Sequence, residues 1–464
     1  MGRLRRKLQG GRSLRLLYLL AVYLAAPIVS AMLLWRGLRD RSYWHNFRER
    51  FGFGARLVPH GVWLHAVSVG EVQACAPLVS ALARRYPDLP LTVTTFTPTG
   101  AARARALFGN LAQVRYVPYD LPGAVRRFFR RVQPRLAVIF ETELWPNLYR
   151  ECGRRRIPLV LASARISARS AGRYQRLGTL FRDTLSRTAL VAAQGAGDAE
   201  RFRSLGADPA STHVTGNIKF DFELPPDIAA RGARLRAQYA EGRPLWVAGS
   251  THAGMEEQAL LEAQQRVRSE HPGALLVLAP RHPPRFDEVA QALHARGVPF
   301  VRRSAAAAAV IDDRCAVLLL DSLGELLDFY AAADVAFVGG SLVAVGGHNL
   351  LEPAALGVPI LTGPHNENGE EIARLLIARG AAEVVHDAAE LGERVGTLLA
   401  DPAERARMGA AGRASVDSNR GALEKLLALI EPLLDPPQEI APNAVSERVP
   451  LGKTRDFPGT PGGG

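Results

Sequence analysis

Two turns in the first half of the sequence carry carboxylates in positions suited to acid–base chemistry. The first, His-Ala-Val-Ser-Val-Gly-Glu at residues 65–71, follows a predicted strand and places Glu71 in the first turn of a predicted helix. The helix dipole favours an ionised carboxylate there, so we expect Glu71 to act as a general base near neutral pH. The spacing of Ser68 and Glu71 also fits a capping box, which only stabilises a helix start, and spacing alone does not separate the two interpretations.

The second turn is Glu-Thr-Glu-Leu-Trp-Pro-Asn at residues 141–147, directly after a predicted strand at 136–140. Glu141 and Glu143 have the chemistry to bind acceptor hydroxyls or to stabilise positive charge that develops on a sugar ring. Acidic residues also occur at helix starts simply because the dipole favours them, and this alternative stays open.

Two further segments supply cations. Arg165 and Arg169 stand among three serines at residues 163–170, a composition that suits an anionic ligand but is also typical of a basic surface loop. Lys219, in Gly-Asn-Ile-Lys-Phe-Asp at residues 216–221, is one of four lysines in a chain with 58 basic residues. A chain that uses arginine for almost every cation is expected to keep a lysine where a compact ammonium is needed, for example against a substrate carboxylate.

A glycine-rich stretch at residues 339–365 dominates the second half. A predicted strand runs into four glycines and a His-Asn pair, and a short helix is predicted to open near Asn349. Glycines let the backbone approach a ligand closely, and a helix start offers unpaired N–H groups, so the stretch predicts a phosphate site. Glu352 is placed to accept hydrogen bonds from ribose hydroxyls. The alternative is that these glycines only form turns.

Other loops are expected on the same rim. Gly-Ser-Thr-His-Ala-Gly at residues 249–254, Pro280-Arg281 and Leu323-Gly324-Glu325 each follow a predicted strand, and Arg281 can form a forked hydrogen bond to a phosphate. Neither half has Gly-x-Gly-x-x-Gly after its first strand, which argues against a dinucleotide dehydrogenase. No Asp-x-Asp pair follows a strand in the first half, so we expect metal-independent chemistry.

These residues require an alternating α/β framework to position them. A chain of 464 residues is long enough for two domains of ordinary size. Short apolar strands alternate with amphipathic helices, which is typical of parallel sheets covered on both faces, and the pattern repeats after a Pro-containing link at 223–244. Strands are predicted at residues 62–66, 91–95, 114–117, 136–140, 158–162 and 190–193, with a short one before Gly216, and then at 245–248, 274–278, 316–319, 335–338 and 358–361. We expect Rossmann-like domains at 41–223 and 224–434 that face each other across a cleft, followed by a disordered Pro- and Gly-rich tail at 435–464.

Residues 1–40 form a separate basic and apolar segment. Residues 16–35 are uncharged and mostly apolar, about the length that spans ~30 Å of hydrocarbon. An uncleaved membrane anchor is preferred to a cleaved signal peptide, because the apolar run continues beyond the weak cleavage motif Val29-Ser30-Ala31. Arginines flank both sides almost equally, so orientation is not fixed, and the helix could span the membrane or lie near one face.

Charge and cysteine content narrow the setting. The net charge of +13 predicts anionic partners such as phosphorylated lipids or nucleic acid. The three cysteines are scattered, with no spacing that predicts zinc or a disulfide framework, so a reducing compartment fits best.

Taken in order, the motifs resemble one known family. Ser-Val-Gly-Glu, Glu-Thr-Glu-Leu-Trp-Pro-Asn, Ser-Ala-Arg-Ile-Ser, Gly-Asn-Ile-Lys-Phe-Asp, Gly-Ser-Thr-His, Pro-Arg-His-Pro and Gly-Gly-His-Asn resemble those of the 3-deoxy-D-manno-octulosonic acid (Kdo) transferases of Gram-negative bacteria, which have the GT-B glycosyltransferase fold. The resemblance covers about residues 14–430. It implies an inverting transfer of Kdo from CMP-Kdo to the lipid A precursor (lipid IVA), on the cytoplasmic face of the inner membrane, with an anionic membrane surface rather than nucleic acid as partner.

The resemblance also implies roles for individual residues. The catalytic base falls on Glu71 and the transition-state stabilisers on Glu141 and Lys219. The CMP contacts fall on Pro280, Arg281, Leu323, Gly324, Glu325, Asn349, Leu350, Leu351 and Glu352. This chain has Asn-Leu-Leu-Glu at 349–352 where the family commonly has Asn-Pro-Leu-Glu, which should loosen the helix start slightly without removing its donors. The alternatives are a GT-B transferase or epimerase that uses a UDP-sugar, and a membrane-tethered binding module without catalysis.

Overall fold

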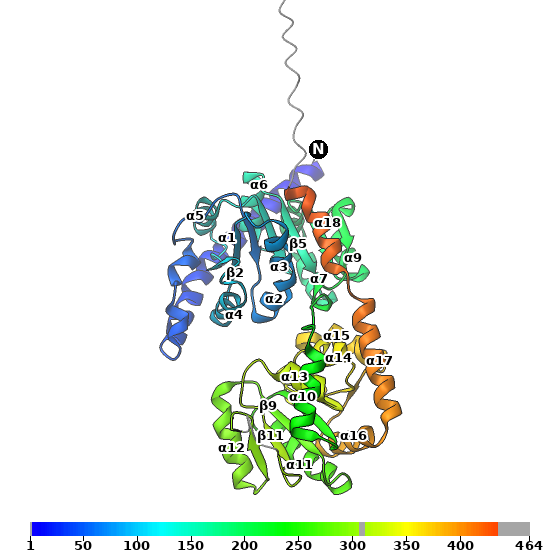
Figure 1. Ribbon diagram of the computed structural model, residues 1–464. Coiled ribbons are helices and arrows are strands. Elements are labelled where there is room, and N and C mark those ends of the chain that lie inside the picture. The colour runs from blue at the N-terminus through cyan, green and yellow to red at the C-terminus, as the bar shows by residue number, and fades with distance from the viewer. Residues whose placement is uncertain (1, 306–310, 435–464) are drawn as a thin grey trace, which may run out of the picture.

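The computed structural model describes residues 2–305 and 311–434, with side chains described from residue 13 onward. Two parallel sheets of seven strands each form two α/β halves in the described residues (Figure 1). This confirms the predicted fold class of two Rossmann-like halves in tandem. The predicted tail at 435–464 lies outside the described residues.

The first sheet has its strands in the order β3-β2-β1-β4-β5-β6-β7. The strands are β1 (Val62–His65), β2 (Leu91–Thr95), β3 (Gln113–Tyr116), β4 (Leu136–Phe140), β5 (Leu159–Ala164), β6 (Leu190–Ala193) and β7 (Thr212–Val214). Both faces of β1 are buried, since Trp63 belongs to one apolar core and Val62 and Leu64 to the other. The chain order reverses between β1 and β4, and such a switch point leaves a crevice at the carboxyl ends of the two strands.

The second sheet has the order β10-β11-β9-β8-β12-β13-β14, with its switch point between β8 and β12. Its strands are β8 (Leu245–Thr251), β9 (Leu275–Pro280), β10 (Phe300–Arg302), β11 (Val317–Leu319), β12 (Val335–Val338), β13 (Ile360–Thr362) and β14 (Ala382–Val384). The strands at both edges, β10 and β14, were not expected. Each has three residues and includes a charged one, so neither shows the continuous apolar run of a central parallel strand.

Helices cover the sheets on both sides. They are α1 (Gly2–Gly37), α2 (Val69–Ala74), α3 (Ala76–Arg85), α4 (Pro98–Phe108), α5 (Pro122–Val132), α6 (Pro146–Arg155), α7 (Ala168–Arg176), α8 (Gly178–Leu185), α9 (Ala196–Leu205), α10 (Ile228–Ala240), α11 (Met255–Glu270), α12 (Phe286–Ala295), α13 (Leu326–Ala332), α14 (Leu351–Leu356), α15 (Glu370–Ala378), α16 (Ala388–Ala400), α17 (Pro402–Ser418) and α18 (Ala422–Leu434). The single helix expected at 71–86 is divided at Cys75, because Pro77 has no N–H to donate to the preceding turn.

The last helix belongs to the first half of the molecule rather than to the second. Whereas α17 runs along the second half, α18 packs beside α3 (Figure 1). Leu427 and Ile430 are fully buried in the same core as Leu78 and Leu82 of α3. The last helix of the domain expected at 224–434 therefore packs on the first domain instead. An amphipathic pattern in the sequence does not tell which sheet a helix covers.

Helix α1 packs against the first half of the molecule with one of its faces. Ala26, Ser30 and Leu33 are buried and recur at the spacing of one helical face. Tyr18 donates a hydrogen bond to Asp120 at 2.7 Å. The opposite face is apolar and exposed, and includes Leu16, Leu20, Leu24, Ile28 and Trp35. Its segment Ser13–Gly37 is long and apolar enough to cross a membrane, which by itself is weak evidence that it does so.

Candidate active site

Glu71 stands at the switch point of the first sheet, in the first turn after β1. Its Oε2 accepts a hydrogen bond from the N–H of Val67 at 2.8 Å, and Ser68 donates to Oε1 at 3.1 Å. The Ser68 hydroxyl in turn accepts from the Glu71 N–H at 3.4 Å. The capping interpretation is therefore correct in geometry, and the same contacts hold the carboxylate in one orientation, so capping and catalysis do not exclude each other.

The ionisation of Glu71 differs from the expectation. Burial raises its pKa to about 7, and the nearby charges of Glu141 and Glu143 act in the same direction. Desolvation thus outweighs the helix dipole that was expected to keep the group ionised. A carboxyl group whose pKa lies near neutral pH has the balance of basicity and availability that general-base catalysis requires.

Glu141 follows β4, directly across the switch point from Glu71. Its backbone has φ of 56°, a left-handed conformation that is uncommon for a residue other than glycine. Its Oε1 accepts a hydrogen bond from Lys219 Nζ at 2.8 Å, and its Oε2 lies 3.8 Å from Arg165 Nε. The structure therefore brings together three residues that the sequence places far apart.

Lys219 is held at the boundary between the two halves. It lies in a single helical turn, Ile218–Phe220, whose start is capped by Asn217 accepting from the Lys219 N–H at 3.0 Å. Ile218 is buried in the core of the first half, whereas Phe220 is buried in a cluster of the second half with Leu350 and Leu351. The position of the ammonium is thus tied to both sheets.

Two buried or partly buried rings, those of Trp145 and His65, pack next to the acidic groups. Trp145 donates through Nε1 to Glu143 at 2.6 Å, and its ring meets the buried ring of His65 edge-on at 5.6 Å. Burial raises the pKa of Glu143 and lowers the pKa of His65 to about 4, so the imidazole is neutral at physiological pH. The Nδ1 atom of His65 lies within hydrogen-bond distance of Thr94, so this nitrogen is directed away from the acidic groups.

At the switch point of the second sheet, two histidines form a close pair. His252 follows β8 and His348 follows β12, and their Nε2 atoms are 2.8 Å apart in stacked rings. Burial lowers the pKa of both, that of His348 to about 4. One neutral ring therefore donates to the other. Both imidazoles belong to predicted rim motifs, and their pairing could not be predicted because they lie 96 residues apart in the sequence.

The expected CMP-binding residues lie at or after the carboxyl ends of three strands of the second sheet, namely β9, its neighbour β11, and β12, which β8 separates from β9. Pro280 ends β9 and Arg281 follows it, exposed, while Leu323, Gly324 and Glu325 follow β11, and Asn349, Leu350, Leu351 and Glu352 follow β12. Arg281 lies close enough to Glu352 to lower its pKa, although burial raises that pKa by more. Arg103, from α4 of the first half, acts on Glu352 in the same way, so the two halves approach each other here. Glu325 is paired with Arg303 at 2.8 Å.

The glycine-rich stretch departs from the expectation at its beginning. Glu256, in the first turn of α11, is fully buried and accepts the N–H groups of Gly340, Ser341 and Leu342 at 2.9, 3.1 and 3.2 Å, and that of His252 at 2.8 Å. These backbone donors are occupied by a carboxylate, so the expectation that this part of the stretch holds a phosphate is wrong. The part that stays available to a ligand begins at His348 and includes the turn into α14.

Glu256 was missed by sequence reasoning. It belongs to a helix that the sequence predicted, but its partners in the glycine-rich stretch are more than eighty residues away along the chain. An acid in the first turn of the predicted helix was the one sequence signal that could have pointed to it.

Solved structures show which class this arrangement belongs to. A UDP-N-acetylglucosamine 2-epimerase from Neisseria meningitidis aligns with 80% of this chain and 99% of its own, with a TM-score of 0.53 and 12% sequence identity. One from Listeria monocytogenes aligns with 82% of this chain and 97% of its own, with a TM-score of 0.52 and 16% identity. At such identity the likeness concerns the fold alone. Two Rossmann-like halves with parallel sheets define the GT-B fold.

Sequence comparisons identify the family within that class. A family model described as 3-Deoxy-D-manno-octulosonic-acid transferase (kdotransferase) matches residues 45–222, and one described as Glycosyl transferases group 1 matches residues 259–415. The 3-deoxy-D-manno-octulosonic acid transferase of Haemophilus influenzae is 40% identical over 91% of this chain and 99% of its own. That of Bordetella pertussis is 40% identical over 89% of this chain and 98% of its own. The chain belongs to the Kdo transferase family, and it is a glycosyltransferase of lipopolysaccharide biosynthesis.

Proposed function

We propose that the protein transfers Kdo from CMP-Kdo to the lipid A precursor, lipid IVA, with inversion at the anomeric carbon and without a metal ion. The observation that carries this proposal is the arrangement at the first switch point. There a carboxyl group with a pKa of about 7, Glu71, lies near a lysine–carboxylate pair formed by Lys219 and Glu141.

The proposed reaction is a single displacement. Glu71 takes the proton of the acceptor sugar's primary hydroxyl while that oxygen forms its bond to the anomeric carbon of Kdo. The bond from this carbon to the phosphate oxygen breaks at the same time, and CMP leaves with the bonding electrons. The base belongs to the first sheet and the expected CMP contacts belong to the second, so attack and departure on opposite faces of the sugar, and hence inversion, suit this arrangement.

The charged residues around the site have complementary roles in this proposal. Lys219, with Arg165, faces the carboxylate of Kdo, and Glu141 both holds Lys219 in place at 2.8 Å and balances the positive charge that develops on the sugar ring. Arg281 and the turn at Asn349–Glu352 bind the departing CMP. Arginine supplies the positive charge that a metal ion would otherwise bring to the phosphate.

Helix α1 is proposed to attach the enzyme to the inner membrane, with both halves on the cytoplasmic side. Its exposed face is apolar, and its buried face reaches the catalytic half through Tyr18 and Asp120. Asp120 also accepts the N–H groups of Asn147 and Leu148 at 2.9 and 2.8 Å, immediately after the turn that carries Glu141. A lipid acceptor would thus be presented next to the site from the surface that α1 contacts.

The test is transfer by the purified full chain with CMP-Kdo and lipid IVA, with the products weighed by mass spectrometry. We expect addition of Kdo by the wild type, none by Glu71→Gln, and full activity in Glu241→Gln, a matched change at an exposed site. Calorimetry should show that Glu71→Gln still binds CMP. Full transfer by Glu71→Gln, or activity with a UDP-sugar and none with CMP-Kdo, would refute the proposal.

A further inference from the structure

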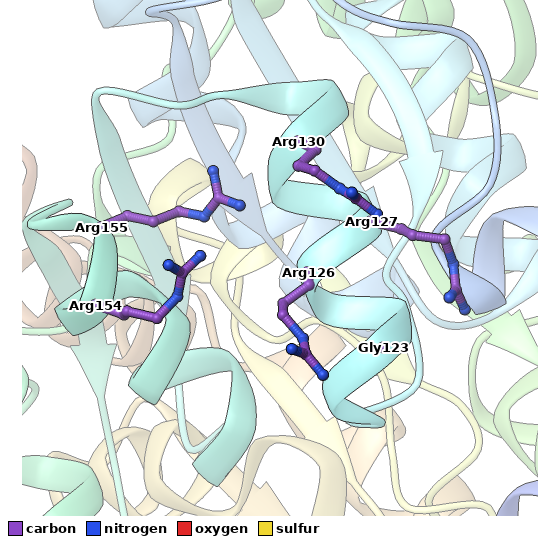
Figure 2. Close-up of a pocket in the computed structure, with 6 residues that line it drawn as sticks. All are labelled: Gly123, Arg126, Arg127, Arg130, Arg154 and Arg155. Carbon is purple, nitrogen blue, oxygen red and sulfur yellow. The ribbon is translucent and has the colours of Figure 1, made fainter.

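A pocket lined by arginines lies between α5 and α6, in the first half of the molecule. Its volume is about 390 Å³, and it is lined by Gly123, Arg126, Arg127, Arg130, Arg154 and Arg155. Figure 2 shows Arg154 and Arg155 reaching from α6 toward α5, which carries the other lining residues. Five guanidinium groups around one hollow repel one another unless an anion lies among them.

Several of these side chains are held in place by the protein. Glu151 is buried and accepts from Arg154 at 2.9 and 2.6 Å and from Arg155 at 2.7 Å. Arg127 donates through Nε to the carbonyl of Phe51 at 2.9 Å and stacks 4.5 Å from the ring centre of Phe53. Ordered guanidinium groups lose less entropy when they bind a ligand, which favours a defined site over a diffuse basic surface.

The three arginines that α5 contributes to the pocket have no carboxylate partner among the described residues. In residues 13–305 and 311–434, no carboxylate forms an ion pair with Arg126, Arg127 or Arg130. Arg126 and Arg130 are exposed and one helical turn apart on α5, so both face the pocket. Arg126 uses Nε to bond the carbonyl of Pro122 at 3.1 Å, which leaves the outer nitrogens for a ligand. A guanidinium fork matches the oxygens of a phosphate.

The pocket is separate from the candidate active site. Three of the five arginines, Arg130, Arg154 and Arg155, lie in the last turns of their helices, while Gly123 and Arg126 lie in the first half of α5. Helices between parallel strands run opposite to the strands, so their last turns lie at the amino-terminal edge of the sheet, whereas Glu71 and Glu141 follow the carboxyl-terminal ends. In Figure 1, α5 and α6 lie on the side of the first half that is remote from the second half. The ligand of this pocket is therefore neither the donor nor the reacting sugar.

Helix α1 crosses the same layer of helices. Ala26 of α1 packs with Leu121 and Ala124 at the start of α5, and Asp120 joins Tyr18 of α1 to the first turn of α6. Further along, α1 contacts α8, which itself contacts α6. The exposed apolar face of α1 and the arginine pocket thus belong to one side of the domain.

We propose that the arginine pocket binds the phosphate of an anionic lipid headgroup in the membrane leaflet that α1 contacts. This inference rests on the proposed membrane attachment of α1 and adds a defined lipid site to it. The apolar face of α1 supplies affinity for the hydrocarbon boundary, and the pocket supplies preference for anionic phospholipid.

The test is sedimentation of the full chain with vesicles of phosphatidylcholine, alone or mixed with phosphatidylglycerol. The double variant Arg126→Gln/Arg130→Gln should bind the mixed vesicles roughly 10- to 30-fold more weakly than the wild type, since each arginine near an anionic surface contributes about 1 kcal/mol. The matched control Arg234→Gln/Arg296→Gln removes the same charge from exposed positions in the second half and should change binding less than about twofold.

Equal losses in the two double variants would show diffuse attraction and overturn the proposal, as would wild-type binding by the pocket variant. If the wild type does not sediment with either kind of vesicle, both the membrane attachment by α1 and the lipid site are refuted. Calorimetry with inorganic phosphate separates the sources, because tight binding without vesicles that the pocket variant loses would assign the site to a soluble phosphate instead. Neither assay contains donor or acceptor, so the outcome is independent of whether Kdo is transferred.

Discussion

Lys219 Nζ donates a hydrogen bond to Glu141 Oε1 at 2.8 Å, and this contact joins the loop after β4 to the loop after β7. Both side chains are mostly shielded from solvent, with 18% of the Glu141 side chain and 23% of the Lys219 side chain exposed. The pair also marks the boundary of the two halves, because the neighbours of Lys219 are buried in different cores. The Lys219 ammonium, which we propose faces the carboxylate of the donor sugar, is thereby positioned from both sheets.

The Lys219–Glu141 pair should act as a unit. Lys219→Met is expected to lower kcat roughly 100- to 1,000-fold, the range for loss of one electrostatic contact to a transition state, while CMP still binds. The double variant Lys219→Met/Glu141→Gln should lose much less than the product of the two single losses, because the residues contact each other. Steady-state kinetics of the wild type, the two single variants and the double variant measure this. A loss in the double variant equal to the product of the two single losses would show that the two residues act independently.

Glu71, the proposed general base, should set the acidic limb of the pH profile. The base must be unprotonated and its pKa is about 7, so kcat/KM should rise tenfold per pH unit below about pH 7 and level off above it. Glu71→Gln should show no transfer at any pH, and any trace of transfer that a sensitive assay detects should lack this limb. Measuring initial rates at constant ionic strength between pH 5 and 9 checks this, and a limb that persists in the variant would assign it to another group.

The same raised pKa predicts that the ionised form of Glu71, which the proposed reaction requires, lowers the stability of the folded protein. The folded pKa of Glu71 lies above its ordinary value, so the native state binds a proton that the unfolded chain releases, and stability is lost as pH rises toward about 7. Glu71→Gln should therefore melt at a higher temperature than the wild type at pH 8, with little difference near pH 4.5. Calorimetric melting at both pH values tests the sign, and Glu241→Gln controls for the loss of a surface charge.

Glu256 should be the residue on which the glycine-rich stretch depends. Glu256→Ala leaves four backbone N–H groups, two of them buried and two partly buried, without their acceptor. We expect a loss of about 3–5 kcal/mol in the free energy of unfolding together with loss of CMP binding. The exposed Glu262 on the same helix is the matched control, and its change to Ala should cost less than about 0.5 kcal/mol. Urea unfolding of both variants measures the two losses in free energy of unfolding. Similar losses in the two variants would show that the glycine-rich stretch does not depend on Glu256.

The sequence predicted the framework well for a physical reason. Central parallel strands are buried on both faces and are therefore continuous apolar runs, as Leu136–Phe140 is, whereas the edge strand Ala382–Val384 is short and contains an acid. The site motifs were also predictable, since polar residues directly after such runs meet at one edge of the sheet. Their roles in the reaction stay proposals.

What the sequence could not reveal depends on contacts between distant segments. Nothing near Glu256 indicates that it binds Gly340 to Leu342, and nothing in α18 indicates that it packs on α3. The pKa of Glu71 was misjudged for a related reason, because the helix dipole is a local effect but burial depends on the whole fold.

The His252–His348 pair should make the second half sensitive to acid. Burial lowers the pKa of both rings below the ordinary value, so the unfolded chain takes up protons that the native state excludes, and stability present above about pH 6.5 is lost as pH falls toward about 4. His348→Asn should flatten this dependence, whereas the exposed His294→Asn should leave it unchanged. Urea midpoints between pH 4.5 and 7.5, followed by tryptophan fluorescence, measure the slope. The two Nε2 atoms are 2.8 Å apart, which leaves room for one proton between them and not two, so protonation of both rings must break this contact. An equal acid dependence in wild type and His348→Asn would therefore show that other groups govern the loss of stability.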